Sequence, residues 1–192
     1  MAVTPSTMLD LGTPLPSFDL PDVVSGKNVH SDSLLGAVSV VAIICNHCPY
    51  VVHIKEELAK FGREMMRSGV RMVALSANDV GTHPMDGPDN MALDAKRYGY
   101  SFPYLFDETQ EVAQAFRAVC TPEFYVFDQG GKLRYRGQFD QSRPSKPTPV
   151  TGSDVRAAVG ALLAGRDPDP EQTPSMGCSI KWKRGNAPSY LG

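Results

Sequence analysis

Apolar residues along this chain follow two periods, one typical of buried strands and the other typical of amphipathic helices. Residues 38–44 form a nearly unbroken run of mostly β-branched side chains, which predicts a central strand buried on both faces. From Pro49 to Met65, apolar residues recur every three or four positions, which predicts a helix packed on a sheet. Residues 70–75 repeat the strand pattern after Gly69. Strand, helix and strand in this order predict a right-handed parallel crossover unit.

The rest of the chain predicts shorter elements separated by loops rich in glycine and proline. We expect extended pieces over residues 12–35, helices over residues 91–98, 109–119 and 155–163, a strand over residues 104–106, and a hairpin from residues 124–127 and 133–137. Thr151 to Asp154 resembles a capping box that opens the last helix. Residues 166–192 show little periodicity, so we expect an irregular tail on the surface. The sequence thus predicts an α/β fold with one domain over residues 1–165, which includes an N-terminal extension, and a C-terminal tail over residues 166–192.

Composition narrows the class of protein. A chain of 192 residues with 42% hydrophobic content fits one domain with a sizeable core. The formal net charge of -2 and the absence of a basic run argue against nucleic acid and an anionic membrane as partners. The N-terminus lacks the basic start and apolar stretch of a secretory signal, and no apolar run reaches membrane-spanning length. We therefore expect a cytoplasmic protein.

Cys45-Asn46-His47-Cys48 lies at the predicted junction of the first buried strand and its helix. Backbone amides and the dipole at a helix N-terminus stabilise an anion, so a thiol there ionises more readily than a free cysteine. We expect Cys45 to be the nucleophile of a thiol–disulfide oxidoreductase, and Cys48 to resolve the mixed disulfide that Cys45 forms. His47 is expected to stabilise the thiolate, and Asn46 to support the motif.

Two other interpretations of this cysteine pair stay open. The two residues could be inert buried thiols, or they could form half of a metal site. Zinc needs four ligands, and Cys120, Cys178 and the remaining histidines provide no second close pair. A copper-chaperone module would join the two cysteines to a distant histidine such as His83, although its cysteine spacing is usually one residue longer. We therefore expect no metal and no cofactor.

Three segments of the chain resemble the redoxin branch of the thioredoxin superfamily, which includes the alkyl hydroperoxide reductase/thiol-specific antioxidant proteins. They are Gly-Thr-Pro-Leu-Pro-Ser-Phe-Asp-Leu at residues 12–20, the strand that ends in Cys-Asn-His-Cys-Pro-Tyr, and Thr121-Pro122 before a Phe-rich strand. The tail, with Gly-Cys-Ser-Ile-Lys-Trp-Lys at residues 177–183, also resembles that of bacterial redoxins with the Cys-Asn-His-Cys motif. The resemblance implies a thioredoxin-like fold, a central mixed sheet flanked by helices, with an insertion for which residues 78–98 are the candidate.

The resemblance also implies roles around Thr121 and Pro122. Pro122 would follow a cis peptide bond, and Thr121 would face the cysteine pair and offer backbone hydrogen bonds to a bound partner. Cys120 would lie close to this loop, where a small buried core residue is its commoner role. Cys120 and Cys178 are the candidates for a third redox thiol.

The chain departs from the peroxiredoxins within this resemblance. Their Pro-x-x-x-Thr-x-x-Cys motif would put the peroxide-reactive thiol at Cys48, but Cys45 then occupies the threonine position and Val41 the proline position. The Cys-x-x-Cys form is that of thioredoxins, so we expect protein or small-molecule disulfides and thiols as partners. A peroxiredoxin-like thiol peroxidase that acts on peroxides is the alternative.

Overall fold

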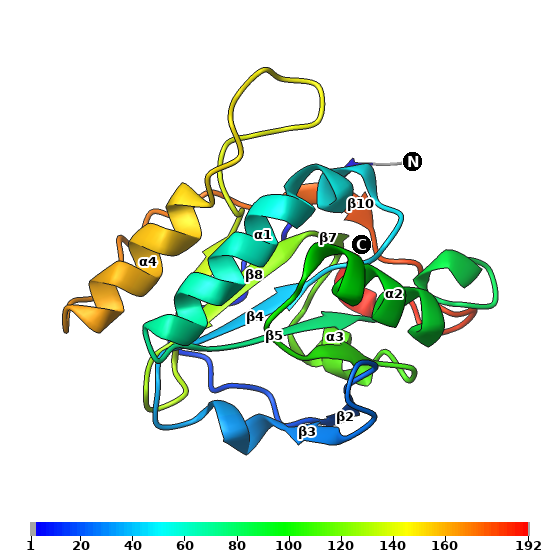
Figure 1. The fold of residues 1–192 in the computed structure, drawn as a ribbon, viewed down its shortest axis with the longest axis horizontal. Coiled ribbons are helices and arrows are strands. Elements are labelled where there is room, and N and C mark those ends of the chain that lie inside the picture. The colour runs from blue at the N-terminus through cyan, green and yellow to red at the C-terminus, as the bar shows by residue number, and fades with distance from the viewer. Residues whose placement is uncertain (1–2, 192) are drawn as a thin grey trace.

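A five-stranded mixed sheet forms the centre of the protein, in the strand order β6-β5-β4-β8-β9 (Figure 1). The computed structural model describes residues 3–191. The strands of this sheet are β4 (Ser39–Ile43), β5 (Arg71–Ser76), β6 (Tyr104–Phe106), β8 (Glu123–Phe127) and β9 (Leu133–Gly137). β4 pairs in parallel with β5 and antiparallel with β8, so the run predicted as a central strand is confirmed at the middle of the sheet. β8 and β9 form the predicted antiparallel hairpin.

Helices cover this sheet on both faces. The α-helices are α1 (Pro49–Arg67), α2 (Pro88–Tyr98), α3 (Glu111–Ala115) and α4 (Ser153–Leu163). The 3-10 helices are η1 (Ser31–Leu34), η2 (Pro84–Asp86) and η3 (Ser189–Leu191). A separate hairpin is formed by β2 (Asp19–Pro21) and β3 (Asn28–His30). Successive residues of a strand point to opposite faces. Val40 and Ala42 of β4 pack with α1, α2 and α4. Val41 and Ile43 point the other way and pack with α3 and the β2–β3 hairpin. The predicted α/β layout is therefore confirmed. None of the helices within residues 3–191 is long and apolar enough to cross a membrane.

An N-terminal and a C-terminal segment pair in a second, three-stranded sheet of the order β1-β10-β7. Its strands are β1 (Val3–Pro5), β7 (Cys120–Thr121) and β10 (Met176–Ser179). The prediction of an irregular surface tail was wrong here, because β10 is a strand and Cys178 and Ile180 are only 4% and 3% exposed. Met-Gly-Cys-Ser lacks apolar alternation, so β10 forms through pairing with β1 and β7 and leaves no local signal. In Figure 1, β10 (orange) lies beside β7, although the two are far apart in the sequence.

Two of the differences from the predicted helix ends have a clear local cause. α3 ends at Ala115 rather than near residue 119, because Arg117 adopts a left-handed backbone with φ of 51°. The predicted capping box before α4 was wrong, since the N-cap residue is Gly152 with φ of 63°. Asp154 instead uses its carboxylate to accept hydrogen bonds from neighbouring side chains. Both differences are local and leave the sheet that carries the cysteine motif unchanged.

Candidate active site

The Cys-Asn-His-Cys motif lies at the junction of β4 and α1, as predicted. β4 ends at Ile43, and α1 begins at Pro49 with Cys48 as its N-cap residue. Proline suits this first helical position because an N–H there has no acceptor within the helix. Cys45 and Cys48 are 1% and 0% exposed, and both are free thiols. The motif therefore holds two neighbouring buried cysteines at a helix N-terminus.

Thr121 lies against both sulfurs of the motif. Its hydroxyl oxygen is 3.4 Å from Cys45 Sγ, and its carbonyl oxygen is 3.3 Å from Cys48 Sγ. The peptide bond between Thr121 and Pro122 is cis, which confirms that prediction. The backbone of Thr121 pairs with Cys178 of β10. This chain's own tail thus occupies one edge of the strand that we expected to offer its backbone to a partner.

Of the two candidate third thiols, Cys178 is the one that approaches the pair. Its Sγ lies 2.7 Å from Cys48 Sγ. Cys120 makes a different contact, with its Sγ 4.0 Å from Glu123 Oε2, and burial raises the pKa of its thiol. The fold therefore brings three sulfurs together, those of Cys45, Cys48 and Cys178.

Cys45 and Cys48 share a hydrogen bond and therefore titrate as a pair. This bond lowers the pKa of Cys48 to about 5 against the opposing effect of burial, with contacts to Cys178 and Thr121 adding to the lowering. The same bond raises the pKa of Cys45 well above its usual range, and burial and the Asp86 carboxylate raise it further. The pair thus loses one proton near pH 5 and retains the second beyond neutral pH.

We expect the reduced pair to hold one thiolate throughout the neutral range. The ultraviolet absorbance of the thiolate should show a first titration midpoint near pH 5. Replacing Cys45 with alanine removes the shared hydrogen bond, so the pKa of Cys48 should rise toward the value of an ordinary cysteine, about 8.5. Cys120→Ala is the control, because its thiol lies outside the pair and its loss should leave the first midpoint unchanged. A first midpoint at about pH 8.5 in the unmodified protein would contradict the shared bond.

Asp86 is fully buried beside the motif and was not predicted from the sequence. Its Oδ1 accepts hydrogen bonds from the backbone amides of Asn46 and His47, at 2.8 and 3.3 Å. Its Oδ2 lies 2.6 Å from His47 Nδ1 and accepts a hydrogen bond from Asn78 Nδ2 at 2.7 Å. Asn46 also donates from its side chain to the carbonyl of Met85. Asp86 therefore fixes both the turn between the two cysteines and the orientation of the His47 ring.

Lys55 is a second buried polar residue behind the motif, and it too was missed. It lies on the buried side of α1 with 4% of its surface exposed. Its Nζ donates a hydrogen bond to the Asn46 carbonyl at 2.8 Å and forms an ion pair with Asp94 of α2. The same atom lies 5.1 Å from the centre of the Tyr98 ring. A buried lysine is stable when it is paired in this way, and here the pairing joins the motif to α2.

Cys45, His47 and Asp86 each offer a metal-ligating atom, and these atoms lie within 4.8 Å of one another. Zinc would need a fourth ligand, or three ligands and a water molecule. The two oxygens of Asp86 already face four donors, two on each oxygen. A metal ion would have to displace hydrogen bonds that hold the turn. The donor set therefore fits a hydrogen-bond network better than a metal site.

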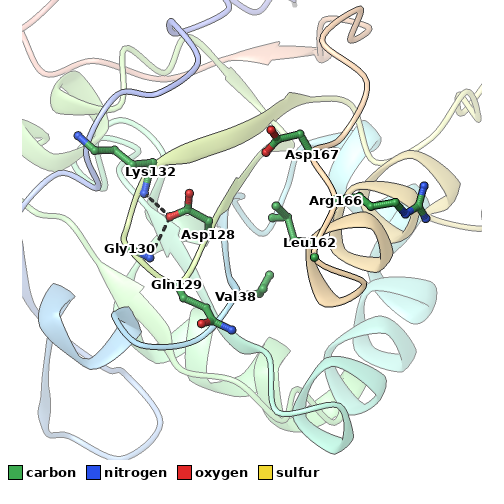
Figure 2. Close-up of a pocket in the computed structure, with 9 residues that line it drawn as sticks. Val38, Asp128, Gln129, Gly130, Lys132, Leu162, Arg166 and Asp167 are labelled. Carbon is green, nitrogen blue, oxygen red and sulfur yellow. Dashed lines mark hydrogen bonds between the residues drawn. The ribbon is translucent and has the colours of Figure 1, made fainter.

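Figure 2 shows a cavity of about 540 Å³ that is lined in part by the turn after β8. It lies at the opposite end of the sheet from the cysteine pair. It is lined by Val38, which precedes β4, and by the turn between β8 and β9, whereas Cys45 follows the other end of β4. Asp128 in this turn accepts hydrogen bonds from the amides of Gly130 and Lys132, each at 2.9 Å. These contacts close the turn. None of the residues expected to carry chemistry lines this cavity.

Residues 11–136 match the model of the AhpC/TSA family, a span that contains the cysteine pair, Asp86 and Thr121. The chain belongs to the AhpC/TSA family. No curated protein matches it. Membership of the AhpC/TSA family supports oxidoreductase chemistry and confirms the resemblance to redoxins.

Solved structures show the same fold. An uncharacterized conserved protein from Geobacillus kaustophilus is 48% identical with a TM-score of 0.93, and the match covers 95% of this chain and 97% of that chain. A hypothetical protein from Sinorhizobium meliloti is 43% identical with a TM-score of 0.92, over 95% of this chain and 100% of that chain. A thiol:disulfide interchange protein of the thioredoxin family from Chlorobium tepidum is 20% identical with a TM-score of 0.62, over 81% of this chain and 99% of that chain. The last match concerns the fold alone, and it confirms the thioredoxin-like fold of this AhpC/TSA family member.

Proposed function

We propose that this protein is a thiol–disulfide oxidoreductase whose Cys45/Cys48 pair alternates between dithiol and disulfide. The observation that carries the proposal is the position of both cysteines at the junction of β4 and α1, with Thr121 against both sulfurs. Membership of the AhpC/TSA family supports it. The partner is a thiol or disulfide of a protein or a small molecule, and the two sulfurs themselves carry the two electrons.

The reaction proceeds by two successive sulfur attacks. The thiolate of Cys45 attacks one sulfur of a partner disulfide, a bond forms between them, and the partner's other sulfur leaves as a thiolate. Cys48 then attacks Cys45 Sγ, and the partner leaves with both sulfurs reduced. Two electrons pass from the pair to the partner. The same steps in reverse oxidise a dithiol partner.

Two sets of contacts favour the thiolate on different sulfurs of the pair. The hydrogen bond from Cys45 and the N-cap position favour a thiolate at Cys48. The Thr121 hydroxyl, 3.4 Å from Cys45 Sγ, can donate to a thiolate there and lowers the pKa of Cys45. We assign the first attack to Cys45, whose thiolate the Thr121 hydroxyl can stabilise directly.

A thiol peroxidase is the second candidate, favoured by the match to the AhpC/TSA family. Aligned with the peroxiredoxin motif, Cys48 is the peroxide-reactive thiol, and a pKa of about 5 suits that role. Cys45 would then condense with the sulfenic acid formed on Cys48 to give a disulfide and water. Cys45 and Val41 stand where the motif has threonine and proline, so disulfide exchange remains the first proposal.

Serine variants of the cysteines test the proposal. Cys48→Ser keeps the attacking thiol and lacks the resolving one, so mixed disulfides should accumulate. With glutathione disulfide as the probe, mass spectrometry should find glutathione bound at Cys45 in nearly every molecule of this variant. Cys45→Ser lacks this attacking thiol and should retain no bound glutathione. Cys120→Ser, which removes a buried thiol outside the pair, is the matched control and should behave as the unmodified protein.

Three other results would contradict parts of the proposal. Capture by Cys45→Ser and not by Cys48→Ser would reverse the assigned order of attack. Peroxide consumption that is lost in Cys48→Ser and kept in Cys45→Ser would favour the peroxidase. Metal in the purified protein, with metal content and stability both lost in either variant and no captured partner, would indicate a metal site.

A further inference from the structure

Cys178 contacts the cysteine pair from a strand near the end of the chain. Its Sγ is 2.7 Å from Cys48 Sγ, and both residues are buried in the same apolar cluster as Cys45. β10, which carries Cys178, pairs antiparallel with β7 on one side and with β1 on the other. Because β10 is paired on both sides, its backbone is fixed in place. The contact between Cys178 and Cys48 is therefore part of the folded sheet.

Gly177 allows β10 to approach the motif this closely. A Cβ atom at this position would lie 2.0 Å from the carbonyl oxygen of Thr121, which is a steric clash. Thr121 is the residue that contacts both sulfurs of the pair. A larger residue in place of Gly177 would therefore push β10 away from β7 and withdraw Cys178 from Cys48. The absence of a side chain at Gly177 therefore permits the contact between the Cys178 and Cys48 sulfurs.

We propose that Cys178 is a third redox thiol, which exchanges with the Cys45/Cys48 disulfide through Cys48. The proposal rests on the proposed function, because it needs that disulfide to form. The Cys178 sulfur attacks Cys48 Sγ, so the bond between Cys48 and Cys178 forms as the bond between Cys45 and Cys48 breaks. Cys45 leaves as a thiolate and takes up the proton that Cys178 gives up. No electrons are gained or lost, and the protein keeps one disulfide.

Burial favours this internal exchange over exchange with an outside partner. Cys45 and Cys48 are 1% and 0% exposed, so an outside molecule reaches them only after a local opening. Cys178 is already in contact with Cys48. The oxidised protein therefore has two forms, one in which Cys45 is bonded and one in which Cys45 is a free thiol while the disulfide lies between Cys48 and β10.

The variant Cys45→Ser isolates the new bond, because it removes the competing partner of Cys48. The chain has 4 cysteines, so three remain in this variant. Oxidation of the folded, full-length variant with glutathione disulfide should give a disulfide between Cys48 and Cys178 in peptide mapping, and the free thiols should fall from three to one. Adding Cys120→Ser as the matched control should preserve this disulfide. Adding Cys178→Ser should abolish it and leave glutathione bound at Cys48.

The unmodified protein and the single variant Cys178→Ser test the proposed function separately, because the disulfide between Cys45 and Cys48 needs no third thiol. Suppose that the Cys45–Cys48 disulfide forms in both of these proteins. If Cys45→Ser then keeps three free thiols, or retains glutathione at Cys48, Cys178 is not a redox thiol. If the Cys45–Cys48 disulfide forms in neither protein, the proposed function fails, and the exchange through Cys48 fails with it. Circular dichroism of each variant confirms that the fold is intact before oxidation.

Discussion

Replacing Asp86 with alanine should lower the free energy of unfolding by about 3 kcal/mol, because loss of one member of a buried charged network leaves its partners unpaired. The backbone amides of Asn46 and His47, the His47 ring and the Asn78 side chain would all lose their hydrogen-bond partner. Two of these residues form the turn between the cysteines. We therefore expect the same variant to slow disulfide exchange, since the two sulfurs are no longer held at a fixed separation.

Urea unfolding followed by circular dichroism measures the effect of Asp86→Ala. Asp89→Ala is the matched control, because Asp89 carries the same side chain in the first turn of α2 and is exposed. Its loss should cost less than about 1 kcal/mol. Asp86→Asn keeps the size of the side chain and replaces one acceptor oxygen with a donor, so its loss of stability should lie between the other two. Equal, small losses for Asp86→Ala and Asp89→Ala would show that Asp86 does not organise the turn.

β4, α1 and the cysteine motif between them could be predicted because their signals are local. A β-branched run needs no distant partner to be recognised as a buried strand, and the apolar spacing of α1 indicates its buried face directly. The position of the motif could then be predicted, because its residues stand between these two elements in the sequence. The cis bond before Pro122 could be expected only through the resemblance to redoxins, because Thr-Pro by itself is a turn signal.

The polar residues around the motif could not be predicted, because their burial depends on partners far away in the sequence. Asp86 stands in a polar loop, and nothing local distinguishes it from the exposed Asp89. Lys55 interrupts the apolar stripe of α1 and is stabilised there by Asp94 of another helix. β10 is a further case, since pairing with β1 and β7 creates this strand and brings Cys178 to the pair.

Glu123 should make the protein less stable as the pH rises from about 4.5 to about 7. Its carboxyl is buried at the start of β8, where it accepts hydrogen bonds from the Ser6 hydroxyl and the Val119 amide. Burial raises the pKa of Glu123 from 4.5 to about 7. Between these values the folded protein keeps the proton that the unfolded chain has already lost, so rising pH favours unfolding. A shift of this size corresponds to about 3 kcal/mol.

Glu123→Gln should remove this pH dependence, because the amide has no proton to lose. Urea unfolding at about pH 4.5 and about pH 7.5 should show the unmodified protein losing about 3 kcal/mol more than the variant between the two conditions. The neighbouring Cys120, Tyr125 and Tyr190 have pKa values raised by burial, so they stay protonated over this range. Glu111→Gln, at an exposed glutamate of α3, is the control and should leave the dependence unchanged. Parallel pH curves for Glu123→Gln and the unmodified protein would mean that another group carries the dependence, and that the Glu123 carboxyl is already ionised in the folded state below neutral pH.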